Sequence, residues 1–117
     1  MWSDRSYMKK QKSKNEKDVP ALVLDRTDER VGSVCISMAG HDKGDYLVVI
    51  AGIDRDCVCV ADGKARKLIA PKKKKMRHLS IIARLPEQAS DVLKQGVYND
   101  SFLRKAISTA LQEANLI

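Results

Sequence analysis

Residues 33–53, SVCISMAGHDKGDYLVVIAGI, decide the expected fold. Val34, Ile36 and Met38 alternate with Ser and Cys, which is the two-residue period of a half-buried strand. Segment 46–53 is rich in Val and Ile and predicts a second, mostly buried strand. The polar stretch between them contains two glycines, so it predicts a connecting loop.

Three more short strands are expected further along the chain. Segment 57–61 predicts a strand, and Asp62-Gly63 is typical of a two-residue hairpin turn that needs positive φ at both positions. Segment 65–69 then returns as the fourth strand, which Pro71 ends. Segment 76–81 supplies a fifth. Five short strands with tight turns predict a small β-barrel, because closure removes exposed sheet edges.

The C-terminal part changes to a helical period. Pro86 and Glu87 suit the first turn of a helix, and Gly96 suits its end. Asn99 or Asp100 can cap a second helix. An apolar face follows at three- and four-residue spacing: Leu103, Ile107, Ala110, Leu111 and Ala114. We expect this face to pack on the barrel or the preceding helix, and a protein partner for these helices is the alternative.

The 117 residues suit one domain with appendages. Residues 1–18 predict a disordered basic tail, residues 19–82 the barrel, and residues 83–117 a helical extension packed on it. The expected fold class is therefore mainly β, a five-stranded barrel followed by two C-terminal α-helices.

Membrane and secretory classes are not supported by the sequence. No uncharged stretch approaches the roughly 20 apolar residues of a membrane span. The N-terminus is charged and has no apolar signal segment, so secretion is not expected. Cys35, Cys57 and Cys59 each lie in an apolar run, as reduced core thiols do, which predicts a reducing cytoplasm. Cys-x-Cys without a second ligand pair is a poor zinc signature, so no metal or cofactor is expected.

The positive charge is concentrated in the tail, residues 1–18, and in residues 64–78. The net charge is +7, which favours a polyanionic partner. Residues 19–63 carry four basic and eight acidic residues, whereas residues 64–78 carry eight basic residues and no acidic one. This basic segment 64–78 is a candidate binding surface, because packed like charges repel one another until a polyanion neutralises them. A solvated charge run or a localisation signal is the alternative.

The glycine-bounded loop is the second candidate. Gly40 and Gly44 permit positive φ, so the loop can turn sharply and expose amides to a phosphate. His41 and Lys43 place donors at its tip. An ordinary strand connection, in which the glycines serve geometry alone, is the alternative reading. His41 beside Asp42 is interpreted as a turn pair rather than a catalytic dyad.

The sequence resembles a known family at these positions. The Ala39-Gly40-His41-Asp42-Lys43-Gly44 loop between two hydrophobic strands looks like the KOW motif of ribosomal and transcription-elongation proteins. Ala61-Asp62-Gly63, the lysines after Pro71 and His78-Leu79 strengthen the likeness. Over about residues 30–79 the chain resembles a bacterial KOW-domain RNA-binding protein, similar to archaeal and eukaryotic large-subunit ribosomal proteins of the fourteen-e type.

The resemblance implies an SH3-like barrel that binds structured RNA, ribosomal RNA in particular, without catalysis. Gly44 is the motif's hallmark glycine, and Gly40 and Gly63 shape loops. Asp45 departs from the basic residue that many relatives carry there. The low aromatic content argues against a surface on which bases stack, so we expect the protein to recognise the phosphates and the shape of the folded RNA. The predicted RNA-binding residues are His41, Lys43, Gly44, Lys64, Arg66, Lys67, Lys72, Lys73, Lys74, Lys75, Arg77 and His78.

Other function classes remain as alternatives or find no support. KOW barrels also act as protein-interaction modules in transcription elongation, and this is the main alternative. An enzyme is not expected, because the two histidines lack a nearby nucleophile motif. No small-molecule substrate and no catalytic or metal-binding residues are predicted.

Overall fold

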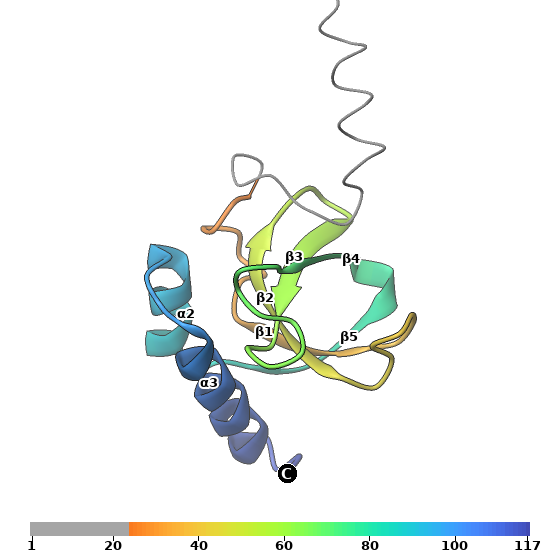
Figure 1. Cartoon of the computed structure of the whole chain (residues 1–117). Helices are drawn as coiled ribbons and strands as arrows, with labels where there is room; N and C mark the ends of the chain where they lie inside the picture. Colours follow the sequence, from red (N-terminus) through yellow and green to blue (C-terminus); the bar gives the residue numbers. More distant parts are fainter. Residues whose placement is uncertain (1–23) are drawn as a thin grey trace, which may run out of the picture.

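The computed structural model describes residues 24–117, which form one sheet followed by two helices (Figure 1). The predicted tail, residues 1–18, lies outside the described residues. The elements in chain order are β1 (Ser33–Ser37), β2 (Tyr46–Gly52), β3 (Cys57–Ala61), β4 (Lys72–Lys75), the short 3-10 helix η2 (Met76–His78), β5 (Leu79–Arg84), α2 (Glu87–Gln95) and α3 (Asp100–Glu113).

The sheet is antiparallel and has the strand order β4-β3-β2-β1-β5. Its two edge strands, β4 and β5, are consecutive in the chain and are joined by the three residues of η2. A link this short requires the sheet to curl until its edges approach each other, as the ribbon shows (Figure 1). No strand pairing joins β4 to β5 within residues 24–117. The described chain is therefore a curled open sheet with two helices, a mixed α and β arrangement rather than a mainly β one.

Each face of the sheet carries its own apolar cluster. The outer cluster lies between the sheet and the helices and includes Val34, Val48 and Leu103. The inner cluster lies inside the curl and contains Cys35, Leu47, Val49, Val58 and Val60, with Met76 and Leu79 packed against it. Because alternate residues of a strand point to opposite faces, both faces of β1 and β2 are buried. The predicted half-buried pattern for β1 was wrong in this respect.

The predicted fourth strand was wrong. Residues 65–69 belong to a long connection between β3 and β4, and the strand is the lysine quartet instead. The Asp62 carboxylate accepts hydrogen bonds from the amides of Lys64 and Arg66, which folds the chain locally. Asp100 at the start of α3 then accepts one from the Leu68 amide, at 2.8 Å. These hydrogen bonds stand where the sequence predicted a two-residue hairpin turn at Asp62-Gly63. The predicted fifth strand begins at Leu79 rather than at residue 76.

The two helices follow the sequence signals closely. Pro86 stands at the N-cap of α2, and Gly96 ends this helix with φ of 81°. The Asn99 side chain caps α3 by accepting a hydrogen bond from the Phe102 amide, at 2.8 Å. The predicted apolar face of α3 is buried against the sheet, except for Ala114, which lies at the exposed C-cap. Among residues 24–117, no helix has both the length and the apolar character that a bilayer requires.

Gly63 provides a test of how the long connection docks on α3. Its φ is 78°, and an added Cβ would lie 2.5 Å from the Asp100 carbonyl oxygen. Gly63→Ala should therefore lower the free energy of unfolding by about 2–4 kcal/mol, through backbone strain and a clash. Gly44→Ala is the control, because Gly44 has φ of 92° but nothing within 4 Å, so strain alone costs about 1–2 kcal/mol. Equal losses in chemical denaturation would contradict the docking.

Candidate nucleic-acid interface

The loop between β1 and β2, residues 38–45, has the two turns that its glycines predicted. Gly40 and Gly44 have φ of 90° and 92°. The loop is closed by backbone hydrogen bonds, in which the amides of Lys43, Gly44 and Asp45 all donate to carbonyls within residues 37–42. These three amides are therefore occupied. The expected phosphate cradle of exposed loop amides is not present at these positions, and the loop offers side chains instead.

Asp42 is the structural centre of this loop. Its Oδ1 accepts a hydrogen bond from the Ser37 hydroxyl at 2.7 Å and from Lys74 Nζ at 2.8 Å. Its Oδ2 lies 3.3 Å from Lys72 Nζ. Lys74 Nζ also donates to the Ala39 carbonyl at 2.9 Å. These contacts join the loop beside β1 to the edge strand β4 across the curl, and we call them the Asp42 latch.

The latch is largely shielded from water, and this changes the titration of its carboxylate. The side chains of Lys74 and Asp42 are 6% and 14% exposed. Burial alone would raise the pKa of Asp42, but the hydrogen bonds from Lys74 and Ser37 and the charges of Lys74 and Lys72 outweigh it. Together they hold the pKa of Asp42 well below its ordinary value of 3.8.

The pleat of β4 divides the lysine quartet. Lys72 and Lys74 lie opposite valines of β3 that belong to the inner cluster, so their side chains turn into the curl. Lys73 and Lys75 lie opposite the two cysteines of β3, turn to the other side, and are exposed. The expectation that the packed lysines repel one another until a polyanion neutralises them was wrong for Lys72 and Lys74, because Asp42 of the same chain pairs with both.

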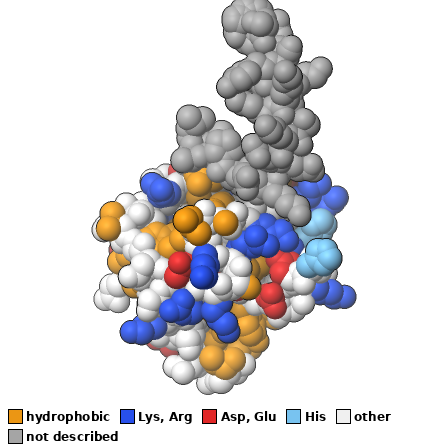
Figure 2. All heavy atoms as spheres, in the orientation of Figure 1, with side chains coloured by type: hydrophobic (Ala, Val, Ile, Leu, Met, Phe, Trp, Pro, Cys, Tyr) orange, Lys and Arg blue, Asp and Glu red, His pale blue; other side chains and the backbone are white. Residues whose placement is uncertain are grey.

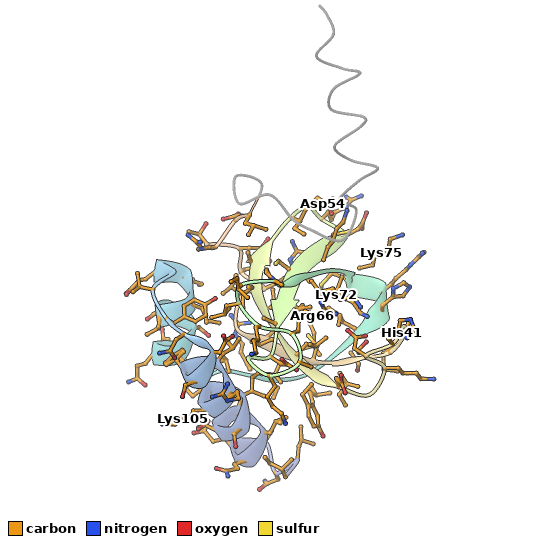
Figure 3. All side chains as sticks on the ribbon, viewed as in Figure 1. His41, Asp54, Arg66, Lys72, Lys75 and Lys105 are labelled. Carbon is orange, nitrogen blue, oxygen red and sulfur yellow. The ribbon has the colours of Figure 1, made fainter. Side chains whose placement is uncertain are left out.

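The exposed cations around β4 form one candidate surface. Lys75 and His41 lie on the same side of the molecule (Figure 3). Basic and histidine side chains gather on that side in the space-filling view (Figure 2). We call this the β4 surface and define it by its exposed or partly exposed members: His41, Lys43, Lys73, Lys75, Arg77 and His78. None of its lysines or its arginine forms an ion pair with a carboxylate of residues 24–117.

The remaining predicted cations lie elsewhere. Lys64, Arg66 and Lys67 belong to the connection between β3 and β4, which crosses the front of the molecule beside α3 (Figure 1). Arg104 of α3 joins them, because its guanidinium donates to the Gly63 carbonyl at 2.6 Å. The predicted residues therefore divide between two surfaces and the latch, and the structure does not gather them at a single site.

The cysteines lie in the core as expected. All three are buried and free. Cys35 belongs to the inner cluster and Cys59 to the outer one, so they lie on opposite faces of the sheet. Burial raises the pKa of each of these two thiols to about 11, which keeps them protonated at neutral pH.

In residues 24–117, no three His, Cys, Asp or Glu side chains are grouped as metal ligands would be.

Comparison with known proteins adds no relative. No protein-family model matches the chain, and no curated protein matches it significantly.

Two residues of the site were missed from the sequence. Asp42 was interpreted as a simple turn residue, yet it pairs with two lysines that lie 30 and 32 positions away. The i and i+2 spacing of Lys72 and Lys74 would have indicated a shared strand face, but lysine runs are poor strand formers and the quartet was not assigned as a strand. Arg104 was missed because its partner, a backbone carbonyl, leaves no sequence signal.

The latch predicts a specific dependence of stability on pH. Because the folded-state pKa of Asp42 is lowered, its stabilisation is complete above the unfolded-state pKa, near 4, and is lost as pH falls below it. Asp42→Asn should lower the unfolding free energy by about 2–3 kcal/mol at pH 7, since two lysines lose their partner. The difference from wild type should shrink as the pH falls below about 4.

Asp45→Asn is the matched control for this measurement. Asp45 lies in the same loop, is exposed, and forms no ion pair with a residue of the described range. It should cost less than about 0.5 kcal/mol at any pH. If urea denaturation at several pH values gave parallel curves for wild type and Asp42→Asn, the latch would not account for the acid sensitivity.

Proposed function

We propose that this chain is a non-catalytic RNA-binding protein of the KOW type, whose curled sheet is an SH3-like barrel. Its ligand is structured RNA, and ribosomal RNA is the favoured target, which would make it a ribosomal or ribosome-associated protein. The observation that carries the proposal is the outward pair Lys73 and Lys75 on β4, exposed and without an ion pair in the described chain.

The charge pattern supports a polyanionic ligand. Within the quartet, the fold neutralises the inward lysines with Asp42 and leaves the outward ones available. Arg77 and Lys43 add exposed cations to the same surface. The acidic turn 54–56 borders the η2 end of β4, but its Asp54 carboxylate accepts from the backbone amides of residues 56 and 57 rather than from a lysine. Cations held on a rigid strand edge suit phosphates, whose condensed counterions they release on binding.

The loop geometry supports the KOW part of the proposal. The KOW resemblance places a glycine turn between two strands, and Gly44 has the positive φ that this position needs. The curled sheet with its edges joined by η2 is compatible with a small barrel in which the latch supplies the closing contact. The preference for RNA over DNA and for ribosomal RNA rests on the resemblance itself.

The mode of recognition follows from which groups are exposed. Lysine side chains on a strand edge read phosphates and helix shape rather than base edges. The loop amides that could have contacted a phosphate closely are largely occupied, so binding relies on side-chain charge. The non-catalytic part of the proposal follows from the sequence, which has no nucleophile motif beside either histidine.

Replacing the outward lysines tests the proposal. Lys73→Ser combined with Lys75→Ser should weaken binding to purified ribosomal RNA and flatten the log–log salt slope by about 1.5 units, since each lost phosphate contact removes about 0.7–0.9. The variant should keep its thermal stability, because neither side chain is buried or forms an ion pair with a residue of the described range. Filter binding across a salt series measures the slope.

Two comparisons sharpen this experiment. Lys94→Ser combined with Lys105→Ser removes the same charge from the helices and should leave the slope within about 0.5 of wild type. Lys72→Ser combined with Lys74→Ser should instead destabilise the fold, because it leaves the Asp42 carboxylate without its two ion-pair partners. Wild-type binding that is absent in dilute buffer, or unaffected by salt, would refute RNA binding and favour a protein-interaction module.

A further inference from the structure

The connection between β3 and β4 exposes an apolar side chain among cations. Ile69 is 90% exposed, the highest value among the large hydrophobic residues of the described chain. Its neighbours in the connection include Lys67, and the same segment carries Lys64 and Arg66. An exposed isoleucine in this position does not contribute to either apolar cluster.

The backbone that carries Ile69 is held from both sides. The Leu68 amide donates to the Asp100 carboxylate at 2.8 Å, and the Leu68 side chain packs against the outer cluster. The Ala70 amide donates to the Lys67 carbonyl at 3.0 Å. Ile69 thus lies between two anchored residues, and the fold orients its side chain outward before any ligand arrives. Because the backbone here is ordered before binding, a contact costs only the rotamer freedom of the isoleucine side chain.

The connection carries basic side chains that form no ion pair with a carboxylate of residues 24–117. Arg66, one of them, is labelled in Figure 3 where the connection passes beside α3. Arg104 uses one guanidinium nitrogen to hold the Gly63 carbonyl, which fixes its charge beside the connection. The carboxylates of Asp62 and Asp100 accept hydrogen bonds from backbone amides of the connection and form no ion pair with a described cation. We call this the α3-side surface: Lys64, Arg66, Lys67, Ile69 and Arg104.

We infer that the α3-side surface is a second RNA contact that binds at an unpaired nucleotide, with Ile69 against the face of the base and the cations on the flanking phosphates. This inference rests on the proposed function and extends it to a class of RNA element. It makes the protein a reader of bulges, loops or junctions within folded RNA, in addition to a binder of phosphates through the β4 surface.

The reason is the mismatch between an apolar side chain and a duplex surface. The outside of an RNA helix presents phosphates and ribose hydroxyls, and its bases are stacked inside. Pressing Ile69 against that surface would remove water from polar groups and return no apolar contact. An unstacked base offers an apolar face, and apolar side chains are used in this way against bases in other nucleic-acid complexes. The surrounding cations would hold the strand close enough for that contact.

Two RNA probes with the same number of phosphates test the inference. One is a blunt RNA duplex, and the other is a duplex with a short bulge of unpaired adenines. The wild-type chain should prefer the bulged RNA by about fivefold to tenfold, as expected from burying about half of an isoleucine side chain. Ile69→Ser should remove most of this preference and leave the salt slope unchanged, since no charge is altered.

Val97→Ser is the matched control. Val97 is 83% exposed and lies in the connection between α2 and α3, outside both surfaces. It should keep the full preference for the bulged RNA, and circular dichroism should show that both variants fold. Equal wild-type affinity for the two RNAs, or a preference that survives Ile69→Ser, would overturn the inference while salt-dependent binding upheld the proposed function. If neither RNA bound at low salt, the proposed function itself would fail, and this inference with it.

Discussion

The ion pair between Asp42 and Lys74 is the contact on which the arrangement of the sheet depends. It links a loop beside β1 to the strand at the far edge, so it acts between parts of the sheet that no backbone ladder connects in the described chain. Burying charged groups is costly unless their hydrogen bonds are satisfied, and here Ser37 and the Ala39 carbonyl complete the set. This ion pair therefore bridges the loop and β4 across the curl that holds the inner apolar cluster. It also determines which lysines of β4 are paired within the fold and which stay exposed.

This division links folding to binding. Four adjacent lysines look like a uniform charge run in the sequence, but a strand turns alternate side chains to opposite faces. Lys72 and Lys74 serve the fold, and Lys73 and Lys75 are presented on a backbone that the other two have anchored. The long connection repeats the principle with different chemistry, since backbone amides held by Asp62 and Asp100 orient the cations beside α3. In both places, acidic residues shape the surface that the basic residues form.

Elements with strong local signals could be predicted from the sequence. The first three strands follow from Val and Ile patterns, and both helices from Gly96, Asn99 and the apolar spacing of α3. The fourth strand could not be predicted, because lysine disfavours strands locally and only pairing with β3 and the latch overrides that preference. The outward direction of two lysines among four depends on a register that no local signal specifies. Charge pointed to the candidate surface in the sequence, but which of its lysines are exposed follows only from the three-dimensional structure.

The placement of Cys35 and Cys59 on opposite faces of the sheet gives each layer of the core its own chemical reporter. Cys59 packs in the outer cluster with the helices and Cys35 in the inner cluster, so a thiol reagent reaches Cys59 when the helices leave the sheet and Cys35 when the curl opens. If the helices separate from the sheet before the curl opens, Cys59 is modified first; if the whole domain unfolds at once, both are modified together. The native chain can therefore report, without any labelling mutation, whether its two layers unfold as one cooperative unit.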